Sequence, residues 1–227
     1  MLQGKGIIVE IQKRILSIFS QFPDALKFYL TGGTALAEFY LGHRLSYDLD
    51  FFTSENGLIS PFSEAMQAEL VKGKFKADVV RRFETFAEFK LSKDEDLTTI
   101  HLAYDSPFRF SPPVDTTLGV KVNDYTDIIV DKLLAFFGRA EPRDAIDLFF
   151  ILKKEDLWKL SELAPQKDTG FDLYWLAAAM DKVRKFPDEI SQWPVDMLVA
   201  IDAREVKNKF SSLVREIMDK IKKTRNF

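Results

Sequence analysis

The sequence predicts an α+β protein with an N-terminal mixed sheet flanked by helices and a C-terminal helical domain. Segments with the short apolar runs or the alternation typical of strands all fall in the first half of the chain. From Asp124 onward the apolar residues recur almost wholly at helical spacing. We therefore expect two domains, 1–121 and 122–227, with the boundary near Lys121. The expected strands are 28–30, 47–52, 77–83, 85–91 and 97–104.

Amphipathic helices are expected in both domains. In the first of them, Ile11, Ile15 and Ile18 share one face and Lys13 and Arg14 lie opposite, so this helix is expected to pack on the sheet. The helices predicted by such spacing are 7–19, 34–41, 61–71, 127–137, 143–152, 154–163, 171–185 and 203–223. The proline-containing segment 111–122 is expected to be an extended connector.

Composition limits the class of protein. A chain of 227 residues with 46% hydrophobic content can bury a full core. The net charge of −3 and the pI near 5.6 argue against a protein that coats nucleic acid non-specifically. Cysteine is absent and only two histidines are present, which argues against disulfides and a zinc centre. No signal peptide or membrane-length apolar run is visible, so we expect a cytoplasmic protein.

A glycine turn follows the first expected strand. Gly32 and Gly33 have no side chains, so backbone N–H groups can converge there on an anion. The helix that follows runs to Leu41 and is stopped by Gly42. Because a helix N-terminus favours a phosphate, we expect Gly32, Gly33 and Thr34 to bind phosphate groups.

Two carboxylates follow on the next expected strand. The period of two places Asp48 and Asp50 on one face, where like charges are unfavourable unless a cation lies between them. Oxygen ligands suit Mg²⁺ or Mn²⁺, with phosphates completing the coordination shell. Arg44 and Ser46 are expected to orient these carboxylates or the phosphates. The stretch 29–52 therefore predicts a site that binds a nucleotide and a metal together.

This order of strand, Gly-Gly, helix and Asp-x-Asp resembles the opening of the polymerase-β-type nucleotidyltransferase fold. The fuller string, GGTAL followed by HR-x-S-x-D-x-DFF, is similar to the AbiEii/AbiGii toxin family of nucleotidyltransferases. A second string, DIIVDKLLAFFGRAEPRDAIDLFFIL, is similar to the same family, which carries a Lys, an Arg and an Arg-Asp-x-x-Asp at this spacing. The matching residues are Lys132, Arg139, Arg143, Asp144 and Asp147.

Lys132 is the candidate for a catalytic cation from the second domain. A triphosphate carries more negative charge than the N–H groups of the glycine turn can neutralise. A cation from the second domain that closed over the triphosphate would neutralise the remaining charge. An exposed helix lysine is the alternative interpretation of Lys132. Arg139, Arg143, Asp144 and Asp147 are possible supporting residues, and an Arg-Asp network that only holds packed helices is the alternative for the last three.

The sequence differs from the polymerase-β pattern at the position of the third carboxylate. Such enzymes usually take it from a later strand near the Asp pair, and the best register of strand 97–104 offers His101 there. Asp105, at the end of the same strand, is the other candidate. Replacement by His101, replacement by Asp105 and absence of the third acid all remain open.

The resemblance implies a metal-dependent enzyme that transfers NMP from an NTP to an acceptor hydroxyl, with the 3′ end of tRNA favoured. It also implies the toxin of a bacterial toxin–antitoxin or phage-defence pair, with a cognate antitoxin as partner. One alternative is transfer to a protein hydroxyl. Another, motivated by His101, is a catalytically silent module that binds nucleotide or a partner. The basic residues of 203–223 and of 72–82 are expected to be either a solvated face or an RNA contact.

Overall fold

The computed structural model describes the backbone of residues 1–225 and the side chains of residues 1–223. The chain divides into two compact units, residues 1–128 and residues 129–227. Helix α4 (Tyr125–Arg139) begins in the first unit and continues into the second.

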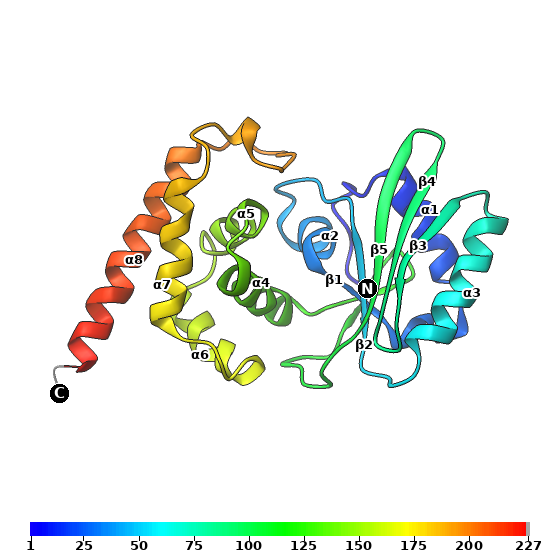
Figure 1. The fold of residues 1–227 in the computed structure, drawn as a ribbon, viewed down its shortest axis with the longest axis horizontal. Coiled ribbons are helices and arrows are strands. Elements are labelled where there is room, and N and C mark those ends of the chain that lie inside the picture. The colour runs from blue at the N-terminus through cyan, green and yellow to red at the C-terminus, as the bar shows by residue number, and fades with distance from the viewer. Residues whose placement is uncertain (226–227) are drawn as a thin grey trace. The chain divides into compact units, whose positions relative to one another are not determined.

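A seven-stranded mixed sheet organises the first unit among the described residues (Figure 1). β2 runs parallel to β5 and β1 runs parallel to β7, while the other neighbours are antiparallel. The predicted α+β class is thereby confirmed. The order across the sheet is β3 (Lys76–Arg82), β4 (Phe86–Lys93), β5 (Asp96–Tyr104), β2 (Leu49–Thr53), β1 (Tyr29–Thr31), β7 (Lys121–Val122) and β6 (Val114–Asp115).

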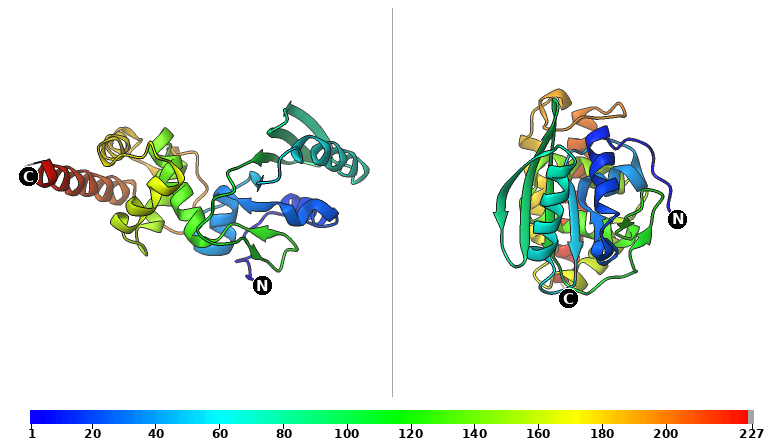
Figure 2. Two further views of the ribbon diagram at one scale, coloured as in Figure 1. Left: turned by 90° about the horizontal axis from the view of Figure 1, so that it is seen from below. Right: turned by 90° about the vertical axis from the view of Figure 1, so that its right-hand side faces the viewer.

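Two helices cover one face of this sheet, α1 (Glu10–Phe19) and α3 (Ile59–Lys72) (Figures 1 and 2). The ring of Phe19 on α1 stacks on the ring of Phe51 on β2, with centroids 3.9 Å apart. Because side chains alternate along a strand, burial of Phe51 on this face directs Asp50 to the opposite one. The aromatic residues of this layer therefore fill the core.

The helix after the glycine turn has two parts. α2 (Gly32–Ala35) continues directly into η2 (Leu36–Leu41), which has π-helical hydrogen bonding. It ends at Gly42, whose φ of 68° is left-handed, so the predicted stop is confirmed. A π turn is rare and is often found at functional sites.

The segment 111–122, predicted as an extended connector, contains two short strands. It contributes β6 and β7, and β7 extends the sheet by pairing Val122 with Leu30 of β1. Each strand has two residues, too few for an alternation pattern to appear in the sequence. The sheet edge next to the glycine turn is thus built from a segment far along the chain.

The second unit is helical, as predicted. Its core contains Phe136, Ile146 and Phe210, each no more than 1% exposed. Asp156 and Asp172 cap the starts of α6 and α7, so these helices begin later than the apolar spacing suggests. The elements after α4 are α5 (Pro142–Ile151), α6 (Leu157–Lys167), α7 (Leu173–Asp181), η3 (Lys182–Lys185), η4 (Ile190–Gln192) and α8 (Ala203–Arg225).

Across the residues that the structure describes, no helix combines the length and the apolar character needed to cross a membrane.

Candidate active site

The glycine turn is shaped by later residues of the same motif. Gly32 has a φ of 72°, and a Cβ there would lie 2.1 Å from the Asp50 Oδ2 atom. A Cβ on Gly33 would lie 2.6 Å from Arg44 Nη2 and 2.8 Å from Ser46 Oγ. Any side chain at either position would displace groups of the predicted site. The turn and the Arg-x-Ser-x-Asp-x-Asp string therefore form one packed structure.

The Thr34 side chain forms hydrogen bonds to the segment that carries Asp48. Its hydroxyl donates to the carbonyl oxygens of Ser46, at 3.2 Å, and of Asp48. The amide of Gln12, on α1, also donates to the Ser46 carbonyl at 3.0 Å. Both side chains are buried. The Thr34 hydroxyl is thus occupied in holding residues 46–48.

Asp50 and His101 are direct neighbours across the parallel pair of β2 and β5. His101 Nδ1 lies 2.8 Å from Asp50 Oδ1, while Oδ2 of the same carboxylate lies over Gly32. Asp48 precedes β2, whose first residue is Leu49, but its charge also acts on His101. That Asp48 faces the same side of the sheet as Asp50 stays a prediction from the period of two.

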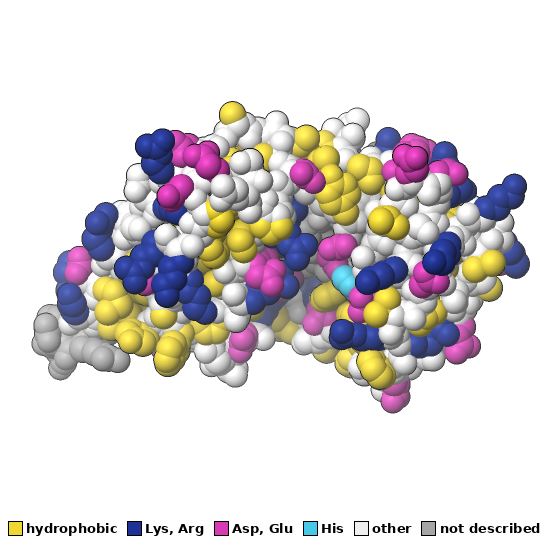
Figure 3. Space-filling view, turned by 45° about the horizontal axis from the view of Figure 1, so that its top comes forward, with side chains coloured by type: hydrophobic (Ala, Val, Ile, Leu, Met, Phe, Trp, Pro, Cys, Tyr) yellow, Lys and Arg dark blue, Asp and Glu magenta, His cyan; other side chains and the backbone are white. Residues whose placement is uncertain are grey.

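His101 lies within a row of charged residues that crosses the sheet. The register places Glu88 of β4 beside His101, and Arg81 of β3 beside Glu88 at 3.5 Å. The hydrogen bond to Asp50 raises the pKa of His101 above its ordinary value. Burial lowers that pKa, and the charges of Asp50, Asp48 and Glu88 raise it further. Figure 3 shows a histidine with acidic and basic side chains around it on this unit.

The donor atoms present fit a hard divalent cation that is shared with a phosphate. Asp48 and Asp50 are partly exposed carboxylates, and Asp50 Oδ2 points to the turn where a phosphate is expected. Among the described residues, no three His, Asp or Glu side chains form a group that would hold a metal alone. The protein thus offers two carboxylates, and further ligands would come from the nucleotide phosphates and water.

The Asp105 carboxylate binds Tyr29 and Arg109. It accepts a hydrogen bond from the Tyr29 hydroxyl at 2.9 Å and pairs with Arg109 at 3.2 Å. The Arg109 guanidinium also lies over the Tyr29 ring, 4.1 Å from its centroid. His101 pairs with Asp50, and Asp105 follows the end of β5 four residues later, about 13 Å away by strand geometry. The position beside Asp50 therefore belongs to His101.

Lys132 belongs to a buried charge network within the second unit. Its Nζ lies 2.8 Å from Asp147 and 3.7 Å from Asp144, and both carboxylates are fully buried. Arg139 completes the network through two contacts with Asp144, at 2.5 and 2.9 Å. Arg143 lies 3.6 Å from Glu141. Lys132 is therefore a held, largely buried lysine rather than the exposed helix lysine of the alternative interpretation.

Two buried carboxylates, Glu38 and Asp127, bind backbone N–H groups, and no sequence motif predicted either of them. Glu38 accepts backbone N–H groups from Gly6, Ile7 and Ile8 at 2.8 to 3.0 Å, and Asp127 accepts from Phe110 and Ser111. Both are buried carboxylates. A charged residue at such a position is the one sequence signal that was available, because burial of a charge requires partners.

Comparison with known proteins gives a consistent family. Residues 14–97 match the family described as Nucleotidyl transferase AbiEii toxin, Type IV TA system. An uncharacterized protein of Aquifex aeolicus is 31% identical over 147 residues, which are 64% of this chain and 68% of that protein. The residues that match the family model, 14–97, contain the glycine turn and both aspartates.

Solved structures share the fold. JHP933 from Helicobacter pylori has a TM-score of 0.53 at 19% identity, covering 96% of this chain and 93% of that one. MenT4, a nucleotidyltransferase toxin from Mycobacterium tuberculosis, has a TM-score of 0.53 at 15% identity, covering 92% and 82%. With its glycine turn packed against an Asp-x-Asp strand, this chain belongs to the AbiEii nucleotidyltransferase toxin family and is an enzyme of the nucleotidyltransferase class.

Proposed function

We propose that this protein transfers a nucleoside monophosphate from an NTP to an acceptor hydroxyl, using Mg²⁺ or Mn²⁺. The observation that carries the proposal is the position of the Asp50 carboxylate, which has one oxygen on His101 and the other over the glycine turn. A cation on that second oxygen would be next to a phosphate held by the turn.

The predicted site residues of the first unit have separate roles in this proposal. The backbone N–H groups at Gly32, Gly33 and Thr34 bind the β- and γ-phosphates, and Asp48 and Asp50 hold the cation. The bound cation supplies charge neutralisation at the phosphates. Arg44 and Ser46 keep the turn and the strand in register. The acceptor oxygen forms a bond to the α-phosphorus, the bond to pyrophosphate breaks, and the acceptor proton passes to solvent.

Lys132 is proposed as the cation that the second domain contributes. The domain division proposed is 1–121 for nucleotide binding and catalysis and 122–227 for closure over the nucleotide. Asp144 and Asp147 would keep the Lys132 ammonium in place, and Arg139 and Arg143 would balance their charge. A lysine already held by carboxylates loses little rotational freedom when it binds a phosphate.

The biological role proposed is that of the toxin in a bacterial toxin–antitoxin or phage-defence pair. The family description supports it, since it names a toxin of a type IV system. The favoured acceptor is the 3′ end of tRNA, the partner is a cognate antitoxin, and the expected location is the cytoplasm. Reading the gene beside this one tests the pairing: a neighbouring antitoxin gene is expected, and its absence would count against the role.

A transfer assay tests the chemistry directly. Purified protein is incubated with each labelled NTP, Mg²⁺ or Mn²⁺, and either tRNA or cell lysate. Wild type is expected to label an acceptor only with the metal present, and Asp50→Asn to lose the activity. Asp78→Asn is the matched control, because Asp78 is an exposed aspartate on strand β3 of the same sheet. Equal labelling by wild type and Asp50→Asn would refute the mechanism.

The two other candidate functions give different results in this assay. Label that runs with protein rather than with RNA would indicate a protein hydroxyl as acceptor. A catalytically silent module is favoured by one observation, the histidine in the third-carboxylate position. It predicts nucleotide binding without label on any acceptor and growth inhibition that Asp50→Asn leaves unchanged.

A further inference from the structure

The two edges of the seven-stranded sheet differ in what lies beside them. At the β6 edge, Leu2 N donates to the Asp115 carbonyl at 2.7 Å, and Thr117 N donates to the Leu2 carbonyl at 3.1 Å. At the other edge, β3 is the outermost strand, and among the described residues no strand lies beyond it. An uncovered edge strand has main-chain N–H and C=O groups that another strand can pair with. The outer edge of β3 is therefore a candidate interaction surface.

This edge also exposes apolar side chains. Val79 and Val80 are 37% and 43% exposed, and Phe83, which follows the strand, is 62% exposed. The register with β4 steps from Val79 to Arg81, so Val80 is the extra residue of a bulge. Edge strands that stay unpaired usually carry charges that repel a second strand. The arrangement of the charges on β3 therefore decides which strand can pair with it.

The pairing of β3 with β4 shows which charged residues share a face. Asp78 pairs with Lys90 of β4. Arg81 pairs with Glu88 of β4. These two β4 residues flank Phe89, which is fully buried on the face that the helices cover. Because side chains alternate along a strand, Asp78 and Arg81 lie together on the opposite face.

The charges of two antiparallel β3 strands are complementary in one register. With a two-fold axis beside Val79 and Val80, Asp78 of each copy lies opposite Arg81 of the other. Opposite charges that face each other across two strands stabilise the pair, and like charges destabilise it. A shift by one pair of residues in either direction would place Asp78 against Asp78 or Arg81 against Arg81. The charges of β3 therefore favour a second copy of the same strand in a single register.

The remaining residues of the edge fit the same register. Lys76 lies opposite Phe83 of the other copy, where its ammonium can contact the face of the ring. Val79 and Val80 of the two copies meet at the axis, which removes apolar surface from water. Each exposed apolar residue of this edge thus has a partner in the pair.

We infer that two copies of this protein associate through antiparallel pairing of their β3 strands, so that their sheets become one continuous sheet. The two copies are related by a two-fold axis, and each contributes the same surface. β3 lies three strands away from β2, which carries Asp50. The interface contains none of the proposed site residues, so the inference does not depend on the proposed function.

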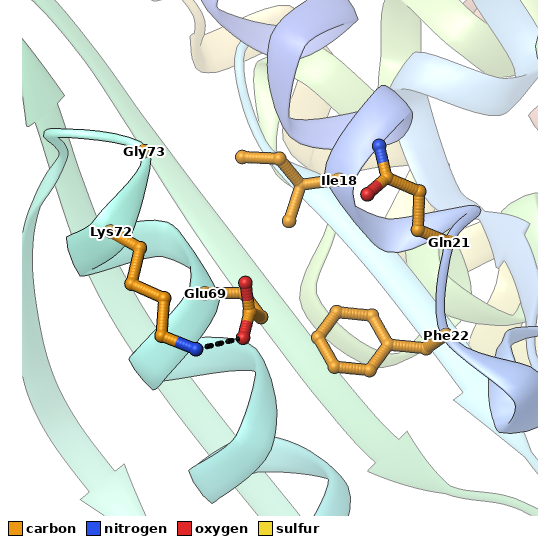
Figure 4. Close-up of a pocket in the computed structure, with 6 residues that line it drawn as sticks. All are labelled: Ile18, Gln21, Phe22, Glu69, Lys72 and Gly73. Atoms are coloured by element: carbon orange, nitrogen blue, oxygen red, sulfur yellow. Dashed lines mark hydrogen bonds and ion pairs between the residues drawn. The ribbon is translucent and has the colours of Figure 1, made fainter.

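The pocket between α1 and α3 is not part of this interface. It has a volume of about 490 Å³ and lies on the face of the sheet that the helices cover (Figure 4). Its polar contact is a Lys72–Glu69 ion pair at 2.6 Å. The residues that line it come from the ends of the two helices and the positions that follow them, and none belongs to β3: Ile18, Gln21, Phe22, Glu69, Lys72 and Gly73.

Sedimentation of the full chain over a range of concentrations tests the inference. Wild type is expected to shift with rising concentration from 26.1 kDa toward twice that mass. Asp78→Arg and Arg81→Asp each place like charges opposite one another, so each is expected to weaken dimerisation about tenfold or more. Glu95→Arg is the control, because it reverses a charge at an exposed residue of the turn between β4 and β5 and should leave dimerisation unchanged.

Mixing the two variants separates loss of pairing from loss of folding. Asp78→Arg and Arg81→Asp are complementary to each other, so an equimolar mixture is expected to form a heterodimer as tightly as wild type dimerises. Only folded chains can form this heterodimer. A mixture that stays monomeric while both variants have the circular dichroism spectrum of wild type would overturn the inference.

Cross-linking identifies the surface that the two copies use. The chain has no cysteine, so an introduced thiol is the only one. Val80→Cys, beside the proposed axis, is expected to be joined to a second copy by a short bis-maleimide. Leu97→Cys is the control and should not be joined, although Leu97 is 73% exposed on β5.

Two further results would contradict the inference. Wild type that remains monomeric at its highest soluble concentration would overturn it, and a strand of a different protein would then be the remaining occupant of the β3 edge. A dimer that both charge reversals leave unchanged, or that the bis-maleimide does not join through Val80→Cys, would place the interface on another surface and overturn the inference as well.

Discussion

At the scale of single residues, the site depends on two glycines for different reasons. Gly32 combines a left-handed φ with contact to Asp50, and Gly33 receives the side chains of Arg44 and Ser46. A motif of small residues is therefore tied to charged residues more than ten positions later. This packing explains why a lone Gly-Gly is a weak signal and the whole string is a specific one.

Replacing Gly32 by alanine separates backbone strain from displacement of Asp50. Gly57 has nearly the same φ, 73°, but no atom within 4 Å of its would-be Cβ. Both alanine variants are expected to lose about 1–2 kcal/mol of unfolding free energy through strain. Only Gly32→Ala should also lose nucleotidyl transfer, because its Cβ requires the Asp50 carboxylate to move. Denaturant titration and the transfer assay check this, and full activity in folded Gly32→Ala would contradict it.

At the scale of elements, the helix after the glycine turn organises the N-terminal segment as well as the site. Glu38, in η2, binds three successive backbone N–H groups of residues 6–8, and Lys5 N donates to the Glu38 carbonyl at 2.8 Å. The backbone of residues 6–8 therefore bends around this carboxylate, and α1 starts at Glu10 instead of Ile7 as predicted. The spacing of apolar residues does not show that a carboxylate about thirty residues later binds these N–H groups.

Glu38→Gln is expected to lower the free energy of unfolding by about 2 kcal/mol, since hydrogen bonds to a buried charged acceptor are stronger than neutral ones. Limited proteolysis should also become faster within residues 1–9. Glu10→Gln is the control, because the Glu10 side chain is 61% exposed and a change there should stay within about 0.5 kcal/mol. Equal stability of the two variants in denaturant would contradict this role of Glu38.

The sequence predicted the elements with strong periodicity and missed those that depend on pairing. Strands β4 and β5 and helix α3 lie close to their predicted ranges, because one face of each is buried. β6 and β7 exist only because they pair with each other and with β1. The predicted strand 47–52 begins at Leu49, since Thr34 and Gln12 take the carbonyls before it.

At the scale of the whole molecule, the sequence indicated the family, while the partners of the Lys132 ammonium required the structure. The domain boundary near Lys121 stays a prediction. Lys132 and Arg139 lie on α4 and Asp144 and Asp147 on α5, and spacing alone does not reveal that both carboxylates are fully buried. Their roles in catalysis stay a prediction that mutation can test.

A double-mutant cycle separates a phosphate-binding role of Lys132 from a structural one. Lys132→Met and Asp147→Asn are each expected to lose about 3–5 kcal/mol of stability, because each leaves a buried charge without its partner. The double variant should recover much of this loss. If Lys132 binds phosphate, the double variant stays inactive in the transfer assay, whereas recovery of activity together with stability would assign Lys132 a structural role only.

Binding of Mn²⁺ in the presence of a non-hydrolysable NTP analogue tests the central claim most directly, because the account requires Asp50 to link the metal to the glycine turn. Electron paramagnetic resonance measures the affinity without any need for an acceptor. We predict that wild type binds Mn²⁺ with the analogue present and that Asp50→Asn weakens the affinity at least about tenfold, since loss of even an outer-shell partner costs ~10–100-fold. Equal affinity of wild type and Asp50→Asn would contradict the account.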